Sequence, residues 1–181
     1  MIQKCSNWKV LRAFFDDPSP KEGFTIRYIS KQIGLATTSV RLHMKELCKE
    51  NKHGYPLVIK SKGISYPTYR ANRSSELFRF YKKIDMTLRL DDCGLLNKLS
   101  EECSPRFIIL FGSASRGEDI KESDVDIFLL TKEREIDIHS YEKVLARKIN
   151  LHFSNDFGSL PKELKNNIIN GILLRGYLKV F

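Results

Sequence analysis

Residues 106–130 read RFIILFGSASRGEDIKESDVDIFLL, and this stretch decides the fold of the second half of the chain. Its first six residues are mostly apolar and follow Pro105, which predicts a short buried strand. A loop of small residues comes next, at 112–117. The stretch then ends in an apolar run that alternates with Asp124 and Asp126, which predicts a second strand.

The two aspartates of this stretch form a candidate metal site. Residues two apart on a strand point to the same face, so the carboxylates of Asp124 and Asp126 are expected to project together. Such a pair can hold Mg²⁺, a hard cation that prefers oxygen ligands and usually also binds substrate phosphates. Gly112 permits a close approach of the backbone, and Ser113 adds a hydroxyl to a loop of N–H groups that can hold phosphate oxygens. A metal beside a phosphate loop indicates phosphoryl or nucleotidyl transfer.

The Gly112-Ser113 loop, Arg116 and the Asp124-Val125-Asp126 motif together resemble the signature of the polymerase-beta-type nucleotidyltransferases, in particular their minimal branch in prokaryotes. The resemblance runs from about Ser104 to the last residue. It implies that the Gly-Ser loop contacts a nucleoside triphosphate, with ATP as the first candidate, and that Arg116 helps to neutralise it. It also implies that both aspartates bind Mg²⁺ and act in catalysis, while a nucleoside monophosphate passes to an acceptor hydroxyl.

One position departs from the pattern of this family, which usually has a third carboxylate on the next strand. That strand is expected at 149–153, and the position holds Asn150, whose neutral amide cannot take a proton from the acceptor. His152 faces the same side and is a candidate base, although a lone histidine on a strand is more often a packed residue. Asp137 and Asp156 fit the position poorly. Two hypotheses therefore stay open, an active enzyme and a nucleotide-sensing or inert domain.

The charge of the chain is unevenly distributed. Residues 1–83 hold 17 Lys+Arg and 6 Asp+Glu, a net charge of +11, whereas residues 84–181 hold 14 and 16, a net charge of −2. This asymmetry favours two domains with different partners and predicts a polyanion as the partner of the first. A basic face that is merely solvated is the alternative.

The apolar spacing of the first half predicts three helices, at 5–15, 25–33 and from Thr37 or Thr38 to about 50. The Asp16-Asp17-Pro18-Ser19-Pro20 segment should end the first, because proline cannot continue a helix. Thr25 is expected to cap the second helix, and Thr37 or Thr38 the third. Gly34 supplies the turn between them. A short helix, a glycine turn and a capped helix are typical of a helix-turn-helix.

Two strand-like runs within 57–70 flank a Lys-Gly turn and predict a basic hairpin. A hairpin directly after a helix-turn-helix resembles the wing of winged-helix transcription regulators, which implies DNA as the partner. Many domains of this kind contact only protein, and that alternative stays open. The residues expected to meet nucleic acid are Thr38, Ser39, Arg41, Lys45, Lys60 and Lys62.

The expected architecture is therefore α/β (α+β), in three parts. Residues 1–71 are a winged helix-turn-helix, 72–102 a linker helix broken near 91–94, and 103–181 a nucleotidyltransferase domain with a mixed sheet and flanking helices. A helix at 140–148 is expected between the last two predicted strands, and another at 163–169. The linker carries an apolar stripe suited to packing or to a homodimer contact, formed by Leu77, Phe80, Tyr81, Ile84 and Leu88.

The composition of the chain indicates the cellular compartment in which the protein is expected. No apolar run reaches the roughly 20 residues that span a bilayer, and the first ten residues do not form a secretory signal. We therefore expect a cytoplasmic protein with no membrane partner. The four cysteines show no zinc-ligand spacing, which argues against a zinc site. Some relatives of the minimal branch act with a helical partner protein, so a protein acceptor is a further candidate.

Overall fold

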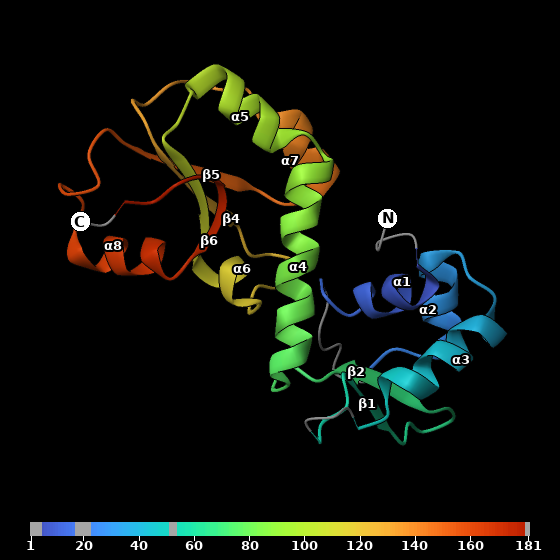
Figure 1. Cartoon of the computed structure of the whole chain (residues 1–181). Helices are drawn as coiled ribbons and strands as arrows, with labels where there is room; N and C mark the ends of the chain where they lie inside the picture. The colour runs from blue at the N-terminus through green and yellow to red at the C-terminus, as the bar shows by residue number, and fades with distance from the viewer. Residues whose placement is uncertain (1–4, 17–22, 51–53, 180–181) are drawn as a thin grey trace. The chain divides into compact units, whose positions relative to one another are not determined.

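The structure is a computed structural model that describes residues 5–16, 23–50 and 54–179. The chain divides into two compact units, Met1–Lys82 and Lys83–Phe181 (Figure 1). The boundary between them falls inside helix α4, which spans Glu76–Asp92. Among the described residues, the first unit has one buried apolar cluster and the second unit has two.

The first unit consists of helices followed by a hairpin, in the order predicted from the sequence. The strands pair antiparallel, and Phe24 adds an isolated bridge to Tyr69 of the hairpin. The helices bury residues such as Leu11, Ile29 and Val40 in one core with the hairpin. The assignment to the winged-helix fold stays a prediction. The elements are α1 (Ser6–Arg12), α2 (Ile26–Ile33), α3 (Thr37–Leu47), β1 (Val58–Ser61) and β2 (Thr68–Ala71).

The turn between α2 and α3 is formed partly as expected. Thr25 caps α2, since its Oγ1 accepts a hydrogen bond from the backbone N–H of Tyr28 at 3.2 Å. Gly34 ends α2 in the left-handed conformation, with φ of 68°. The prediction that Thr37 or Thr38 caps α3 is wrong: the N-cap is Ala36, which makes no side-chain cap. The helix begins so soon after the glycine turn that Thr37 and Thr38 already lie in its first turn.

The predicted ends of two of these helices are also corrected. Helix α1 stops at Arg12, and the next three residues form a turn that buries Phe14 and Phe15. It therefore ends before the predicted terminator, of which residues 17–20 lie outside the described part. Helix α3 stops at Leu47 and not near residue 50.

The second unit is built on a four-stranded mixed sheet in the order β5-β4-β3-β6. Strand β3 is antiparallel to both of its neighbours, β4 and β6. Strands β4 and β5 are parallel and are connected by helix α7 (His139–Leu145), which ends three residues earlier than predicted. The mixed α+β architecture expected for this half is thus confirmed. The strands are β3 (Phe107–Phe111), β4 (Val125–Leu130), β5 (Ile149–Ser154) and β6 (Ile172–Gly176).

Helices cover both faces of this sheet (Figure 1). On one face, Val125 and Ile127 of β4 pack with the end of α4, with α5 (Leu95–Cys103) and with α7. On the other face, Phe107 and Phe128 pack with α8 (Lys162–Ile169). Strands β3 and β4 therefore alternate between two apolar layers, which explains why β3 is buried along its whole length.

The predicted break near 91–94 is present, because Gly94 adopts φ of 84° between α4 and α5. The predicted apolar stripe of the linker is only partly buried, and its role in packing or in a homodimer stays a prediction. Phe80 is 50% exposed, whereas the buried apolar residues of α4 are Phe78, Met86 and Leu90. Apolar residues occur on more than one face of this helix, so spacing alone did not select the buried one. None of the described helices is long and apolar enough to cross a membrane.

Candidate functional site

The two carboxylates of the Asp-x-Asp motif converge on one point at the start of β4. Val125 and Ile127 face the core, so Asp126 projects from the opposite face of the strand. Asp124 lies immediately before the strand and is exposed. The amide Nδ2 of Asn150 donates to both, at 3.3 Å from Asp124 Oδ2 and 3.1 Å from Asp126 Oδ1. The sequence expectation that the pair projects together agrees with this geometry.

Asn150 occupies the position next to the pair because β5 runs parallel to β4 with Asp126 opposite Asn150. The two other acids weighed for this position lie in local turns. Asp137 Oδ1 accepts from the backbone N–H of His139 at 3.0 Å, and Asp156 Oδ1 from that of Gly158 at 2.9 Å. Within the described ranges, no group of three or more His, Cys, Asp or Glu residues gathers as a metal site.

His152 lies on the same side of β5 as Asn150, next to Asp126. Its Nε2 is 3.6 Å from Asp126 Oδ1, which is slightly too far for a hydrogen bond. That nitrogen is shielded from solvent and has no hydrogen-bond partner among the described residues. The ring also packs edge-on against Phe111, with centroids 5.1 Å apart. His152 is therefore both a packed residue and a neighbour of the carboxylate pair.

The loop after β3 approaches the carboxylates through Gly112. This residue has φ of 72°, and a Cβ placed on it would lie 2.6 Å from Asp126 Oδ2. It opens the short helix α6 (Gly112–Arg116), in which Ser115 Oγ donates to the carbonyl of Gly112 at 2.8 Å. Ser113 is half-exposed at the start of this turn. The glycine is thus required by a close approach, as its place in the motif suggested.

The arginine of the loop is engaged elsewhere in this structure. Arg116 Nε lies 2.8 Å from Glu118 Oε2, in an exposed ion pair. Its expected contact with phosphate stays a prediction. Arg175 pairs with Asp91 of α4.

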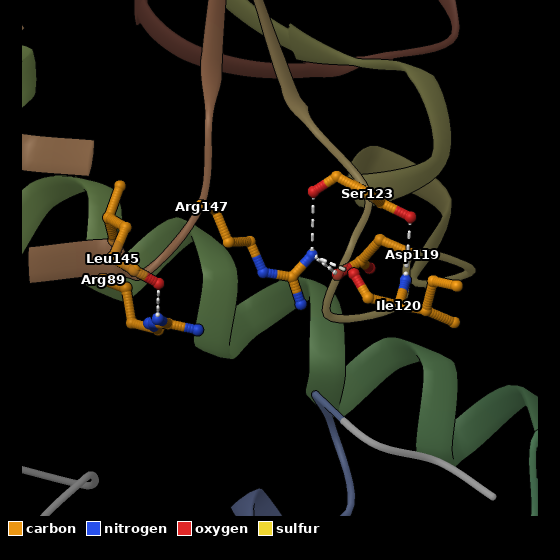
Figure 2. A network of polar contacts seen from close by, with 6 residues as sticks. All are labelled: Arg89, Asp119, Ile120, Ser123, Leu145 and Arg147. Carbon is orange, nitrogen blue, oxygen red and sulfur yellow. Dashed lines mark hydrogen bonds and ion pairs between the residues drawn. The ribbon is translucent and has the colours of Figure 1, made fainter. Parts of the chain in front are cut away.

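A buried ion pair positions the segment that leads into the carboxylates, and sequence reasoning missed it. Arg147 and Asp119 meet at 2.9 Å, with side-chain exposures of 1% and 0%. Arg147 Nη1 also donates to the carbonyls of Ile120 at 2.5 Å and Ser123 at 3.3 Å (Figure 2). Arg147, two residues before β5, therefore holds the backbone that leads into Asp124. An arginine and an aspartate 28 positions apart left no recognisable signal in the sequence.

A second contact ties the same region to α4. Arg89 Nη2 donates to the carbonyl of Leu145 at 2.6 Å, at the end of α7 (Figure 2). The chain then turns through Ala146, which adopts φ of 53°. The turn that carries Arg147 into β5 is thus anchored on both sides.

The residues expected to meet nucleic acid fall into three groups. Arg41, Lys45 and Lys60 line one groove between α2, α3 and the hairpin. Lys62 lines a separate hollow at the tip of the hairpin. Thr38, which is exposed, and Ser39, which is half-buried, line neither.

Comparison with known proteins identifies the class of the second unit. Residues 94–177 match the family described as "Polymerase beta, Nucleotidyltransferase". This part of the chain is therefore a nucleotidyltransferase-type domain, and the sequence resemblance is confirmed for it. A solved structure described as "Crystal structure of the toxin-antitoxin with AMP-PNP" is 25% identical, with a TM-score of 0.35. That match covers 45% of this chain and 71% of the other. No curated protein matches the chain.

Proposed function

We propose that the protein transfers a nucleoside monophosphate from a nucleoside triphosphate to an acceptor hydroxyl, with ATP and Mg²⁺ as first candidates. The observation that carries this proposal is the convergence of Asp124 and Asp126 beside Gly112. It lies in the part of the chain that matches the nucleotidyltransferase family.

The residues at this point fit a divalent cation. Two carboxylates project toward one amide N–H donor, which marks a place where positive charge is stabilised. Rotation of the Asn150 amide would offer its carbonyl oxygen in place of the N–H. Asp124 and Asp126 would hold the ion, with that oxygen as a neutral neighbour. A bound Mg²⁺ would supply charge neutralisation for triphosphate oxygens.

The residues of the chain would bind and orient the reactants. Gly112 lets the loop approach the aspartates, and Ser113 offers a hydroxyl to the phosphates. In the transfer, the acceptor oxygen forms a bond to the α-phosphorus, the bond to pyrophosphate breaks, and the hydroxyl proton leaves. We assign the proton to His152, because its Nε2 is next to Asp126 and has no hydrogen-bond partner among the described residues.

Calorimetric titration tests the nucleotide site. Each of the four nucleoside triphosphates is titrated into the full chain with and without Mg²⁺. We expect Mg²⁺-dependent binding with Kd of about 1 μM to 1 mM, the range usual for enzyme substrates. Asp124→Ala should abolish it, and Asp137→Ala, which removes an equal charge from a local turn, should not. If no nucleotide binds, the proposal is wrong.

A second candidate is a regulator whose nucleotidyltransferase-type domain senses nucleotide or is inert. Asn150 favours it, because the position beside the aspartates lacks the carboxylate that would act as a base. Triphosphate labelled at the α-phosphate separates the two. Label transferred to the chain, to nucleic acid or to an added helical partner protein supports the enzyme. Binding without release of pyrophosphate supports the sensor.

For the first unit we propose DNA binding through α3 and the hairpin. Arg41, Lys45 and Lys60 line one groove, and each cation near a phosphate releases condensed counterions. The test is fluorescence anisotropy of labelled duplex DNA at several salt concentrations. Arg41→Ala and Lys45→Ala should each lower the salt slope by about 1. Lys31→Ala, an exposed change on α2, is the control. Salt-independent or absent binding contradicts this proposal.

A further inference from the structure

The first unit contains a groove of about 970 Å³ that is separate from the candidate nucleotidyltransferase site. It lies between the start of α2, one face of α3 and the hairpin. Ile26, Met44, Pro67 and Tyr69 contribute apolar surface to it. Met44 and Tyr69 are only 2% and 6% exposed, so both belong to its floor. Its volume lies within the range of small-molecule sites, roughly 300–1,000 Å³.

Cations surround this apolar floor. Arg27, Arg41, Lys45 and Lys60 all line the groove, and none of them pairs with a carboxylate in the described part of the chain. Lys49, a further lining cation, is paired with Glu46 at 2.7 Å. An anion that enters the groove therefore meets several uncompensated positive charges.

The floor also presents a polar group without a partner. The hydroxyl of the buried Tyr69 has no hydrogen-bond partner among the described residues. Burial raises the pKa of Tyr69, Cys48 raises it further, and Arg41 lowers it, so the phenol lies near both residues. Burial also raises the pKa of the Cys48 thiol. Tyr69 thus keeps its proton as a donor, and Cys48 carries no negative charge that would repel an anion.

We propose that this groove binds a small amphipathic organic anion, an aryl or alkyl carboxylate or sulfonate. Its apolar body would cover Met44 and Pro67, and its acid group would accept from Tyr69 and pair with Arg41. A nucleic-acid backbone needs the cations but leaves the apolar floor and the Tyr69 hydroxyl uncovered. Because Arg41, Lys45 and Lys60 are also the proposed DNA contacts, the anion and DNA compete. The inference is independent of nucleotidyl transfer.

A fluorescence titration of the full chain with anilinonaphthalene sulfonate tests the proposal. We expect saturable binding, no comparable binding of neutral phenylnaphthylamine, and displacement by octanoate but not by octanol. Tyr69→Phe and Arg41→Gln should each weaken binding about 10-fold, the effect of one lost hydrogen bond to a charged group. Lys31→Gln, an exposed change on α2, should not. Thermal unfolding with a wild-type midpoint establishes that each variant is folded.

The opposite results overturn the inference. Fluorescence that does not saturate, or equal binding of the neutral probe, excludes a site for an anion. Equal affinity of wild type, Tyr69→Phe and Arg41→Gln places the probe elsewhere. Displacement of the bound probe by duplex DNA supports competition, whereas simultaneous binding of both excludes it.

Discussion

Gly112 and Asp126 are so close that no side chain fits between them. A Cβ on Gly112 would lie 2.6 Å from Asp126 Oδ2, and the backbone φ of 72° already disfavours any residue but glycine. The loop therefore lies directly against Asp126, and a side chain at position 112 would displace this carboxylate.

Replacement of Gly112 by alanine should abolish nucleotide binding and destabilise the chain by more than the backbone conformation alone predicts. The left-handed conformation costs about 1–2 kcal/mol for a residue with a Cβ. Gly34→Ala is the matched control, because Gly34 has φ of 68° and nothing within 4 Å of the added atom. Urea unfolding and calorimetry measure both effects. Equal losses in the two variants would show that the contact with Asp126 is unimportant.

Asn150→Asp should increase the affinity for divalent cations and destabilise the metal-free chain. The substitution replaces an N–H donor to two carboxylates by a third negative charge. Addition of Mn²⁺ should therefore raise the melting temperature of the variant by more than that of the wild type. Asn170→Asp is the control, because Asn170 is exposed at the end of α8. An unchanged response to Mn²⁺ contradicts the assignment of this position.

Arg147→Leu should destabilise the chain by about 3–5 kcal/mol, because it removes one member of a buried ion pair. Arg116→Leu should change stability by only about 0–1 kcal/mol. The two ion pairs have similar lengths, 2.9 and 2.8 Å, but only the first is buried. Urea unfolding of both variants checks this. Similar losses would mean that burial of the Arg147 pair has no energetic consequence.

The stability of the chain should fall at alkaline pH. Burial raises the pKa of the Cys48 and Cys103 thiols above their ordinary value. Each native thiol therefore holds its proton after the unfolded one has lost it. The stability from these thiols is complete below the unfolded thiol pKa, about 8.5, and is lost as pH rises through the native value. Urea unfolding from neutral to alkaline pH measures the slope.

Alanine variants identify which thiol causes the loss of stability at alkaline pH. Cys48→Ala should reduce the alkaline loss of stability, although the variant is less stable at neutral pH. Cys5→Ala, which removes an exposed thiol, is the control. An identical slope in wild type and Cys48→Ala would remove Cys48 as a cause.

Much of the candidate site could be predicted from local patterns. Strands β3 and β4 follow from short apolar runs bounded by Pro105, a glycine loop and polar residues. The family resemblance places Asn150 where a third carboxylate is usual, and the register, with Asn150 opposite Asp126, agrees with that assignment. The most deeply buried residues of α4, Phe78, Met86 and Leu90, could not be predicted from spacing. The apolar residues of this helix occupy several faces, and packing in each unit's core selects among them.

The sequence by itself determined the order of the elements, the asymmetry of charge, and the pairing of Asp124 with Asp126, because each depends on residues close together in the chain. Only the tertiary structure decided that Asn150 donates to both aspartates and that Arg147 meets Asp119. Both contacts join segments on either side of α7, and their geometry depends on the pairing of β4 with β5. The spacing of residues along the chain does not give the distance between such segments, because strand pairing and core packing determine that distance.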